Sequence, residues 1–475
     1  MRTLTTHVKF LQVSFASLLA LTLLLIHGTP FITNLILHNL SLSLSLTYIS
    51  LLSLFLLLRS SRRRRVYLLD YSCFKPAFDR KLSYEICEYF VRRTRRFTTK
   101  SEEFMRGIYR KSGLGDETYG PPFIFGWNNQ KNEADLHSAL QEAQEGMFSS
   151  IDSLLSKTLM SPNDIDIVIV TCGMFNPIPS LTSILVNKYK FKHDVKTYNL
   201  SGMGCSSGVM SIDLAAKIVR ASNKTLNALV VATESISQNW YFGDDRSMLV
   251  TNCIFRVGCA AAIVTNDASR RSSAKMEVLT TLRTHHGANN ASYEAALQRE
   301  DEFGNPGVAL TKDLIRVAAQ GLKEHVRLLA PRVLPLSQLV WYVYSVVAAR
   351  LTGAGGGKLV VPDFSTAFEH MCVHTGGKAV IEQVGRVMGL SEEATEPARM
   401  SLHRFGNTSS SLVFYELAYF EAKGRVKIGD RVWVLAFGTG FKVCSLVLRA
   451  LRDSRQGEID NPWRDCIHRY PLKAW

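Results

Sequence analysis

One cysteine lies in a stretch of small residues that could hold a reactive thiol. Residues 199–208 read Asn-Leu-Ser-Gly-Met-Gly-Cys-Ser-Ser-Gly, with Cys205 near the centre. Apolar residues then recur at helical spacing, which predicts that Cys205 sits on a tight turn opening a buried helix. The amides and dipole of a helix start favour an anion, so a thiolate should form more readily there than in a free cysteine. A buried structural cysteine is the alternative.

Three later stretches carry residue types suited to acyl transfer. His374 precedes a Gly-Gly turn, and Asn407 precedes a helix whose start Thr408–Ser410 could cap. Gly438, Thr439 and Gly440 form a small-residue turn whose N–H groups could hold an oxyanion. Taken singly, these are equally typical of a core histidine, a helix cap and a hairpin turn.

The segments that must position these side chains alternate between helical and strand patterns. A helical pattern covers residues 132–159. Runs typical of buried strands cover residues 165–170, 227–232, 261–264, 276–282, 432–437 and 442–448. This alternation indicates α/β layers. The apolar segment 334–351 contains Ser, Gln and Arg, and predicts a helix on a membrane surface or in the core; the glycine-rich stretch 353–357 predicts a loop.

The N-terminal region has the composition of a membrane anchor. Residues 10–58 contain no Asp, Glu, Lys or Arg, and their two most apolar parts, 10–26 and 42–58, are each near the lower length limit for a bilayer span. A signal peptide is the alternative, but a second apolar segment follows without a convincing cleavage site. The arginines after residue 58 predict, by the positive-inside rule, that both the N-terminus and the body face the cytosol.

Composition narrows the classes of function. The nine cysteines form no CxxC pairs, which argues against a zinc site or a disulfide framework and favours a reducing compartment. The net charge is +15, but no nucleic-acid motif accompanies it, so nucleic acid is not an expected partner. The chain also lacks a nucleotide-binding motif of the G-x-G-x-x-G or Walker type. We therefore expect neither a cofactor nor a metal.

The order Cys205, His374, Asn407 and then the glycine turn resembles the thiolase-like condensing enzymes that use a Cys-His-Asn triad. The family most similar in motifs is the 3-ketoacyl-CoA synthases of plant very-long-chain fatty acid elongation. The similarity covers essentially the whole chain apart from the C-terminal tail. It is carried by the two apolar segments, the cysteine motif and residues 67–76, 113–122, 175–189, 238–255, 283–288, 362–381 and 403–441.

The resemblance implies an α/β fold of the thiolase-like type, duplicated and layered α-β-α-β-α, after a two-helix membrane anchor. It divides the chain into an anchor (1–61), a basic lead-in (62–122), a half with the nucleophile (123–275), a half with the histidine and asparagine (276–452) and a tail (453–475). It also implies a homodimer in the endoplasmic reticulum membrane, with the catalytic body facing the cytosol.

The same resemblance implies a reaction. The enzyme would join a long-chain acyl-CoA to malonyl-CoA, giving a 3-ketoacyl-CoA, CO2 and CoA, without a cofactor. Cys205 would form the acyl-enzyme, His374 and Asn407 would stabilise the malonyl-derived enolate, and the Gly438–Gly440 turn would help hold the oxyanion. Reductases and a dehydratase would act on the product.

Three further histidines are candidates for supporting roles. His285 matches a family histidine and suits a structural or substrate-positioning role. His370 and His403 could orient the triad or fill ordinary core or capping positions. The chain departs from the family at Cys259, where glycine is usual, and at Ser201 and Ser207. Cys259 is larger than glycine and could crowd a neighbouring strand.

Two other functions remain open from sequence. An inactive paralogue could act as a scaffold in an elongase complex, although the intact triad argues against this. A soluble type III polyketide synthase would share the fold, although the apolar hairpin argues against it.

Overall fold

The computed structural model describes residues 47–48, 50–52, 64–126, 134–351, 363–374 and 376–473. Residues Arg65–Trp475 form one compact unit. Its helices are α4 (Tyr84–Thr94), α5 (Thr99–Lys111), α6 (Pro122–Gly126), α7 (Leu136–Thr158), α8 (Leu181–Tyr189), α9 (Ser207–Ala221), α10 (Arg246–Ile254), α11 (Asn290–Glu294), α12 (Leu314–Val333), α13 (Leu336–Leu351), α14 (Lys378–Met388), α15 (Glu392–Phe405) and α16 (Leu412–Ala422). Its strands are β1 (Tyr67–Cys73), β2 (Lys81–Leu82), β3 (Thr118–Tyr119), β4 (Ile167–Cys172), β5 (Lys196–Ser201), β6 (Asn227–Thr233), β7 (Cys259–Thr265), β8 (Met276–His285), β9 (Ala296–Glu300), β10 (Pro306–Leu310), β11 (His370–Val373), β12 (Arg431–Gly438) and β13 (Lys442–Ala450).

Nine strands form one sheet in the order β11-β12-β13-β8-β1-β7-β6-β4-β5. Strands β4, β5 and β6 are parallel and β7 is antiparallel to β6. In the later part of the chain, β11 and β12 are parallel and β13 is antiparallel to β12. The two parts therefore repeat the same combination of pairings, and β1 joins them by pairing with both β7 and β8.

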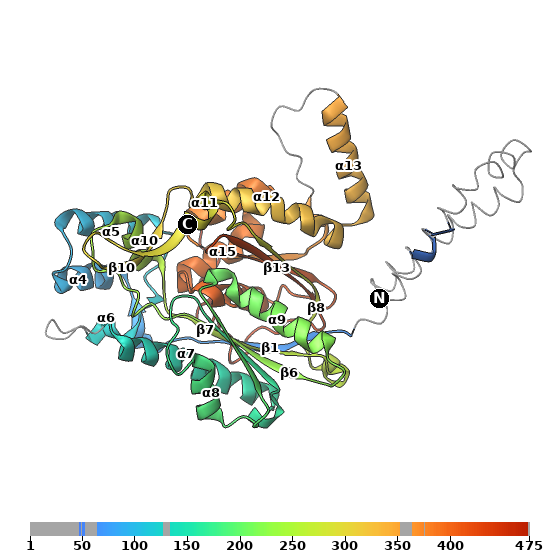
Figure 1. Ribbon diagram of the computed structural model, residues 1–475, viewed down its shortest axis with the longest axis horizontal. Helices are drawn as coiled ribbons and strands as arrows, with labels where there is room; N and C mark the ends of the chain where they lie inside the picture. The colour runs from blue at the N-terminus through green and yellow to red at the C-terminus, as the bar shows by residue number, and fades with distance from the viewer. Residues whose placement is uncertain are drawn as a thin grey trace, which may run out of the picture. The chain divides into compact units, whose positions relative to one another are not determined.

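Alternating side chains on the strands divide the unit into layers. On β6, Ala228 and Val230 pack with α9 and α16, whereas Leu229 and Val231 pack with α7 and α8. Strand β12 likewise turns alternate residues toward α9 and α16 and toward α12 and α14. The two halves of the sheet lie on either side of α9 and α16, so the layers follow the order helix, half-sheet, helix, half-sheet, helix, from α7 and α8 at the bottom of Figure 1 to α12 at the top.

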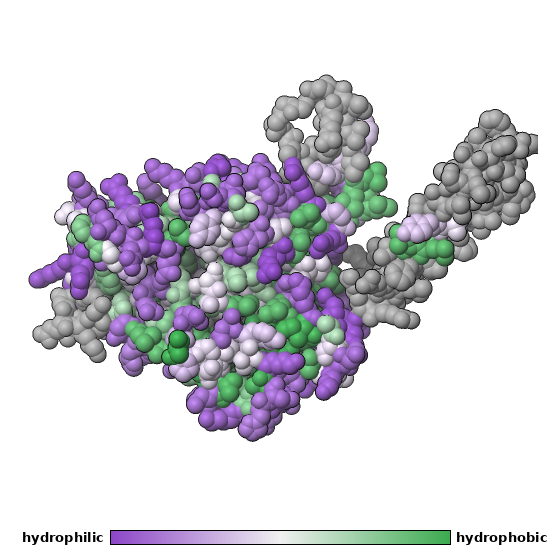
Figure 2. Space-filling model, viewed as in Figure 1, coloured by the Kyte–Doolittle hydropathy of each residue, from purple (hydrophilic) through white to green (hydrophobic). Residues whose placement is uncertain are grey.

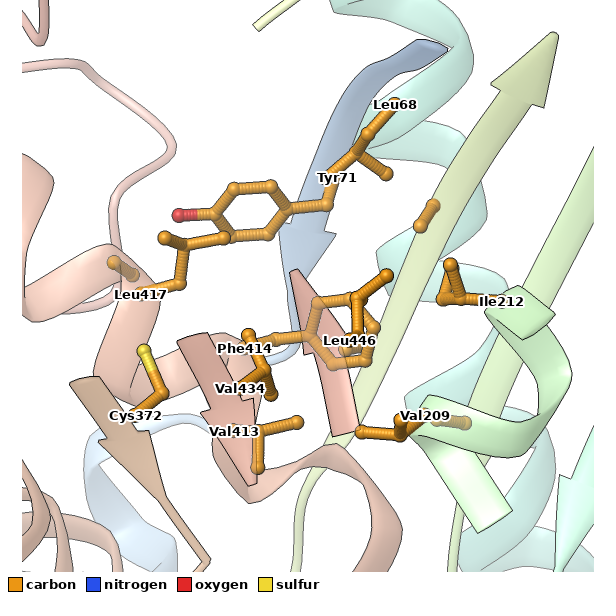
Figure 3. Packing of buried hydrophobic residues seen from close by; sticks show 14 of the residues in the cluster. Leu68, Tyr71, Val209, Ile212, Cys372, Val413, Phe414, Leu417, Val434 and Leu446 are labelled. Carbon is orange, nitrogen blue, oxygen red and sulfur yellow. The ribbon is translucent and has the colours of Figure 1, made fainter. Parts of the chain in front are cut away.

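The central layer consists of two buried helices. Side chains from α9, α16 and the inner faces of β1, β12 and β13 meet there, and each fully buried aliphatic residue contributes about 1.5–3 kcal/mol. Figure 3 shows this packing around Leu68, Val209, Ile212, Val413, Phe414, Leu417, Val434 and Leu446. Helix α9 begins two residues after Cys205, so the rigid core fixes the position of the cysteine.

The predicted strands at 165–170, 227–232, 261–264, 276–282, 432–437 and 442–448 are confirmed, as β4, β6, β7, β8, β12 and β13. The helix predicted over 132–159 is α7, which begins at Leu136 because the Asp135 side chain accepts a hydrogen bond from Ser138 N, 2.9 Å away. The expected α/β layers are therefore present.

Helix α13 is the apolar segment predicted at 334–351. Leu336, Val340, Trp341 and Tyr344 are 62%, 61%, 52% and 70% exposed. These residues lie outside the core, so the predicted placement of this helix in the core is wrong. The apolar surface at the start of this helix is visible in Figure 2.

The predicted spans and the glycine-rich loop cannot be followed in the structure. Residues 10–26, most of 42–58 and all of 353–357 lie outside the described residues. Within the described part of the chain, no helix is both long enough and apolar enough to cross a membrane.

Candidate active site

The candidate site lies where parallel strands of both parts end. In such sheets, the residues that follow the carboxyl ends of the strands meet at one edge. Glu234 follows β6, Cys205 lies in the turn after β5, and His374 follows β11. These three residues and Asn407 line one cavity of about 600 Å³. The structure thus brings together the three residues predicted from sequence to act in catalysis.

Cys205 lies in a single 3₁₀ turn, η3 (Gly204–Ser206), that leads into α9. Its predicted position at a helix start is confirmed, and its side chain is partly exposed to the cavity. Burial nevertheless raises the pKa of the thiol to about 12, although a hydrogen bond from Ser409 acts in the opposite direction. The expectation of a readily formed thiolate is therefore wrong for the resting site. A base must remove the proton when substrate is bound.

Ser409 and Glu234 support the thiol, and neither role was predicted from the sequence. Ser409 Oγ lies 3.5 Å from Cys205 Sγ and 2.8 Å from Glu234 Oε2. Glu234 also accepts hydrogen bonds from Met174 N at 2.8 Å and Gly173 N at 3.1 Å. Glu234 follows a buried strand, which was an available sequence signal. No sequence signal indicated that Glu234 lies close to Ser409, because 175 residues separate the two.

Replacing Ser409 by alanine is expected to slow alkylation of Cys205 by iodoacetamide roughly two- to tenfold, the effect of losing one hydrogen bond. The physical reason is that Ser409 lowers the pKa of the Cys205 thiol, so its removal leaves less thiolate at any given pH. Ser410→Ala is the matched control, because Ser410 Oγ donates to Thr233 O instead. Equal alkylation rates for Ser409→Ala and the control would contradict this role.

His374 is buried at the end of β11, where its backbone N donates to Leu435 O at 2.8 Å. Burial lowers the pKa of its imidazole to about 4, so the ring is neutral near pH 7. Within the described residues, Nδ1 has no hydrogen-bond partner. A neutral imidazole has one acceptor nitrogen and one N–H donor, so it can accept a thiol proton and can donate to an oxyanion.

Asn407 follows α15, and its side-chain orientation is fixed by the chain around it. Its Oδ1 accepts a hydrogen bond from Ser409 N at 2.9 Å. Its backbone N donates to Ile254 O and its carbonyl accepts from Arg256 N. With Oδ1 engaged, the Nδ2 group remains as the donor for a ligand in the cavity.

The turn between β12 and β13 contains Gly438, Thr439 and Gly440, all of which line the cavity. A Cβ at Gly438 would collide with Ser206 Oγ, and one at Gly204 would collide with the backbone N of Thr439. Glycine therefore lets the turn pack directly against the cysteine loop. This is the closeness that a shared oxyanion site requires.

The three additional histidines do not share one environment. His285 ends β8, is exposed and lines the cavity, and partial desolvation, followed by the charge of Lys442, lowers the pKa of its ring. His370 pairs with Asp430 at 2.9 Å, at the opposite end of β11 from His374. Four strand residues span about 13 Å, so it cannot orient His374 directly. His403 Nδ1 lies 3.0 Å from Tyr470 OH, also away from the cavity lining. Only His285 is positioned for a role at the site.

Cys259 does not crowd a strand. Its side chain points toward α7, where Gly146 leaves room for it and Ser150 Oγ lies 3.4 Å from its sulfur. A Cβ at Gly146 would lie only 2.9 Å from Cys259 Cβ.

Among the described residues, no group of three His, Cys, Asp or Glu side chains could hold a metal ion.

Comparisons with known proteins identify related sequences. Residues 58–351 match the family model "FAE1/Type III polyketide synthase-like protein", and residues 365–450 match the C-terminal model of 3-oxoacyl-[acyl-carrier-protein] synthase III. The chain is 44% identical to 3-ketoacyl-CoA synthase 17 of Arabidopsis thaliana, over 87% of this chain and 84% of that protein. It is also 44% identical to 3-ketoacyl-CoA synthase 2 of the same plant, over 90% and 82%.

Solved structures show the same fold. One is the CsyB complex with CoA-SH, with a TM-score of 0.63, 17% identity, and coverage of 81% of this chain and 100% of that one. Another is 1,3,6,8-tetrahydroxynaphthalene synthase from Streptomyces coelicolor A3(2), a bacterial type III polyketide synthase, with a TM-score of 0.62, 19% identity, and coverage of 81% and 99%. The expected thiolase-like α/β fold is confirmed.

Proposed function

The chain belongs to the 3-ketoacyl-CoA synthase family, and on that basis we propose that its cavity condenses a long-chain acyl-CoA with malonyl-CoA. The protein is an acyltransferase that catalyses the condensing step of very-long-chain fatty acid elongation. The observation that carries the site assignment is the presence of Cys205, His374 and Asn407 around one cavity. Neither the scaffold nor the polyketide synthase alternative is favoured by the 44% identical relatives.

The first half-reaction transfers the acyl group to Cys205. His374, neutral near pH 7, accepts the thiol proton as the sulfur attacks the thioester carbon. The backbone N–H groups of Cys205 and of the Gly438–Gly440 turn hold the developing oxyanion. The C–S bond to CoA then breaks, and the departing CoA sulfur takes the proton from His374. The products are an acyl-enzyme and free CoA.

The second half-reaction extends the chain. Malonyl-CoA loses CO2, and the electron pair of the broken C–C bond forms an enolate of the thioester. His374 and Asn407 donate hydrogen bonds to the enolate oxygen. The enolate carbon attacks the acyl thioester, giving the 3-ketoacyl-CoA, and the Cys205 thiolate leaves and regains a proton from water. Apart from this solvent proton, all reacting groups come from the chain and its two CoA substrates.

Labelled malonyl-CoA and a range of acyl-CoA primers, added to membranes containing the protein, provide the direct test of function. The proposal requires a labelled 3-ketoacyl-CoA two carbons longer than the primer. Consumption of malonyl-CoA alone, to give an aromatic polyketide, would instead support a type III polyketide synthase.

We further propose that the protein resides in the endoplasmic reticulum membrane, with residues 1–61 as anchor and the catalytic body facing the cytosol. We also expect a homodimer that works with reductases and a dehydratase. Support for membrane contact comes from α13, whose exposed Trp341 and Tyr344 are residue types enriched at membrane interfaces. Residues 325–362 contain four Arg and Lys residues and no Asp or Glu, which suits anionic headgroups.

Removal of residues 1–58 is expected to leave measurable binding to anionic vesicles, and the double substitution V340D/W341D should weaken that binding at least tenfold. The reason is that each apolar side chain buried in lipid contributes about 1.5–3 kcal/mol. Phe303→Asp is the control, because Phe303 is 80% exposed but lies outside α13. Cosedimentation with vesicles measures the affinity, and equal affinities for V340D/W341D and the control would exclude α13 as the contact.

A further inference from the structure

A buried lysine in the cavity has no acidic partner. Lys442 is 6% exposed and lines the cavity. Its Nζ donates one hydrogen bond, to Thr439 O at 2.6 Å. Among the described residues, no carboxylate lies within ion-pair distance of this ammonium group. A buried charge is costly unless it is paired, so this arrangement is incomplete without an anion.

The surroundings of Lys442 add positive charge. Strands β8 and β13 place Lys442 directly opposite His285, and Arg283 lies two residues earlier on the same face of β8. Burial lowers the pKa of the Lys442 ammonium most, and the positive charge of Arg283 lowers it further. Lys442 and Arg283 also lower the pKa of His285. An anionic group entering here would relieve these repulsions.

The cavity lining carries little negative charge that would repel such an anion. Glu234 is the carboxylate that lines the described cavity, and it already accepts hydrogen bonds from Ser409 and two backbone N–H groups. Much of the remaining lining is apolar, including Val308, Leu310 and Phe441. Lys442 is therefore the one permanent cation among the described residues lining the cavity.

The two proposed substrates differ chemically in a way that matches this site. Both are CoA thioesters, but malonyl-CoA alone carries a free carboxylate, and its malonyl group must reach the acyl group on Cys205 in the same cavity. We propose that Lys442 binds the carboxylate of malonyl-CoA and so selects this substrate for the second half-reaction. This inference rests on the proposed function.

The chemistry predicts which kinetic parameter responds. The ion pair exists while the malonyl group is bound and is lost when the C–C bond breaks and neutral CO2 leaves. It therefore stabilises the bound substrate rather than the later anionic enolate. An interaction of that kind affects KM more than kcat.

The test compares malonyl-CoA with acetyl-CoA, which lacks only the carboxylate. Each is used as an inhibitor of the initial rate at which labelled acyl-CoA acylates Cys205 in the full-length protein. The variant K442Q removes the charge but keeps an N–H donor on a shorter side chain, and K442M removes both the charge and the donor. In the wild type, malonyl-CoA should inhibit at least tenfold more tightly than acetyl-CoA, as expected for a hydrogen bond to a charged group.

In K442Q this preference for malonyl-CoA should fall to less than threefold, and the KM for malonyl-CoA should rise roughly tenfold. A preference that survives in K442Q, or is lost only in K442M, would mean that Lys442 merely tethers the turn, and would overturn the proposal. Equal weakening of both inhibitors would also overturn it, by assigning Lys442 to the CoA phosphates. Failure of the proposed function is distinguishable, because the wild-type protein itself would then show no acylation.

Discussion

Replacing Cys205 by alanine is expected to abolish product formation, with a loss on the order of 10⁴–10⁶-fold. The physical reason is that no other cysteine can replace Cys205 as the nucleophile. Cys205 is the one cysteine that lines the cavity among the described residues, and the other eight are buried. The measurement is the rate of 3-ketoacyl-CoA formation from acyl-CoA and malonyl-CoA.

Cys253→Ala is the control for this experiment. Cys253 is fully buried in the cluster with Phe90, Met105 and Trp240 and does not itself line the cavity. The control should retain condensation, and both variants should remain in the membrane fraction. Product formation by Cys205→Ala at the rate of the control would contradict covalent catalysis at this residue.

Replacing Asn407 by aspartate is expected to slow decarboxylation of malonyl-CoA roughly a hundred- to a thousandfold, or about 3–4 kcal/mol. The change removes the Nδ2 donor and adds a negative charge beside the developing enolate, at a buried position where charges are weakly screened. The local fold should survive, because an aspartate oxygen can still accept the hydrogen bond from Ser409 N. Acylation of Cys205 should suffer less, since backbone N–H groups hold its oxyanion.

His374→Ala supplies the contrast for Asn407→Asp. His374 serves both as base for the thiol and as donor to the enolate, so its removal should impair both half-reactions. Acyl-enzyme formation from labelled acyl-CoA and CO2 release from labelled malonyl-CoA measure the two steps separately. If Asn407→Asp blocked acylation as completely as decarboxylation, with the fold intact, this division of roles would be wrong.

The periodic features of the chain could be predicted from sequence. The β-branched runs became buried strands because their apolar side chains pack on both faces of the sheet. The turn at Cys205 was predictable because the following apolar residues recur at helical spacing. The order of the triad residues was informative only through the family resemblance, since their chain separation says nothing about distance.

Other features depend on packing between distant segments. The pKa of Cys205 is set by burial, which no local pattern around residue 205 reports. Neighbours in sequence were also misleading. His370 precedes His374 by four residues, but an extended strand carries the two side chains apart. The pairing of Lys442 with His285 depends on the register of β8 against β13, which a single sequence does not encode in any local motif.

The most direct test of the account is to locate the acyl group. The full-length protein is incubated with labelled acyl-CoA in the absence of malonyl-CoA, then digested, and the modified peptide is identified by mass spectrometry. The proposed mechanism predicts a thioester on Cys205, which added malonyl-CoA discharges as a 3-ketoacyl-CoA with release of CO2. Label on any other residue, or product formation without an acyl-enzyme at Cys205, would contradict it.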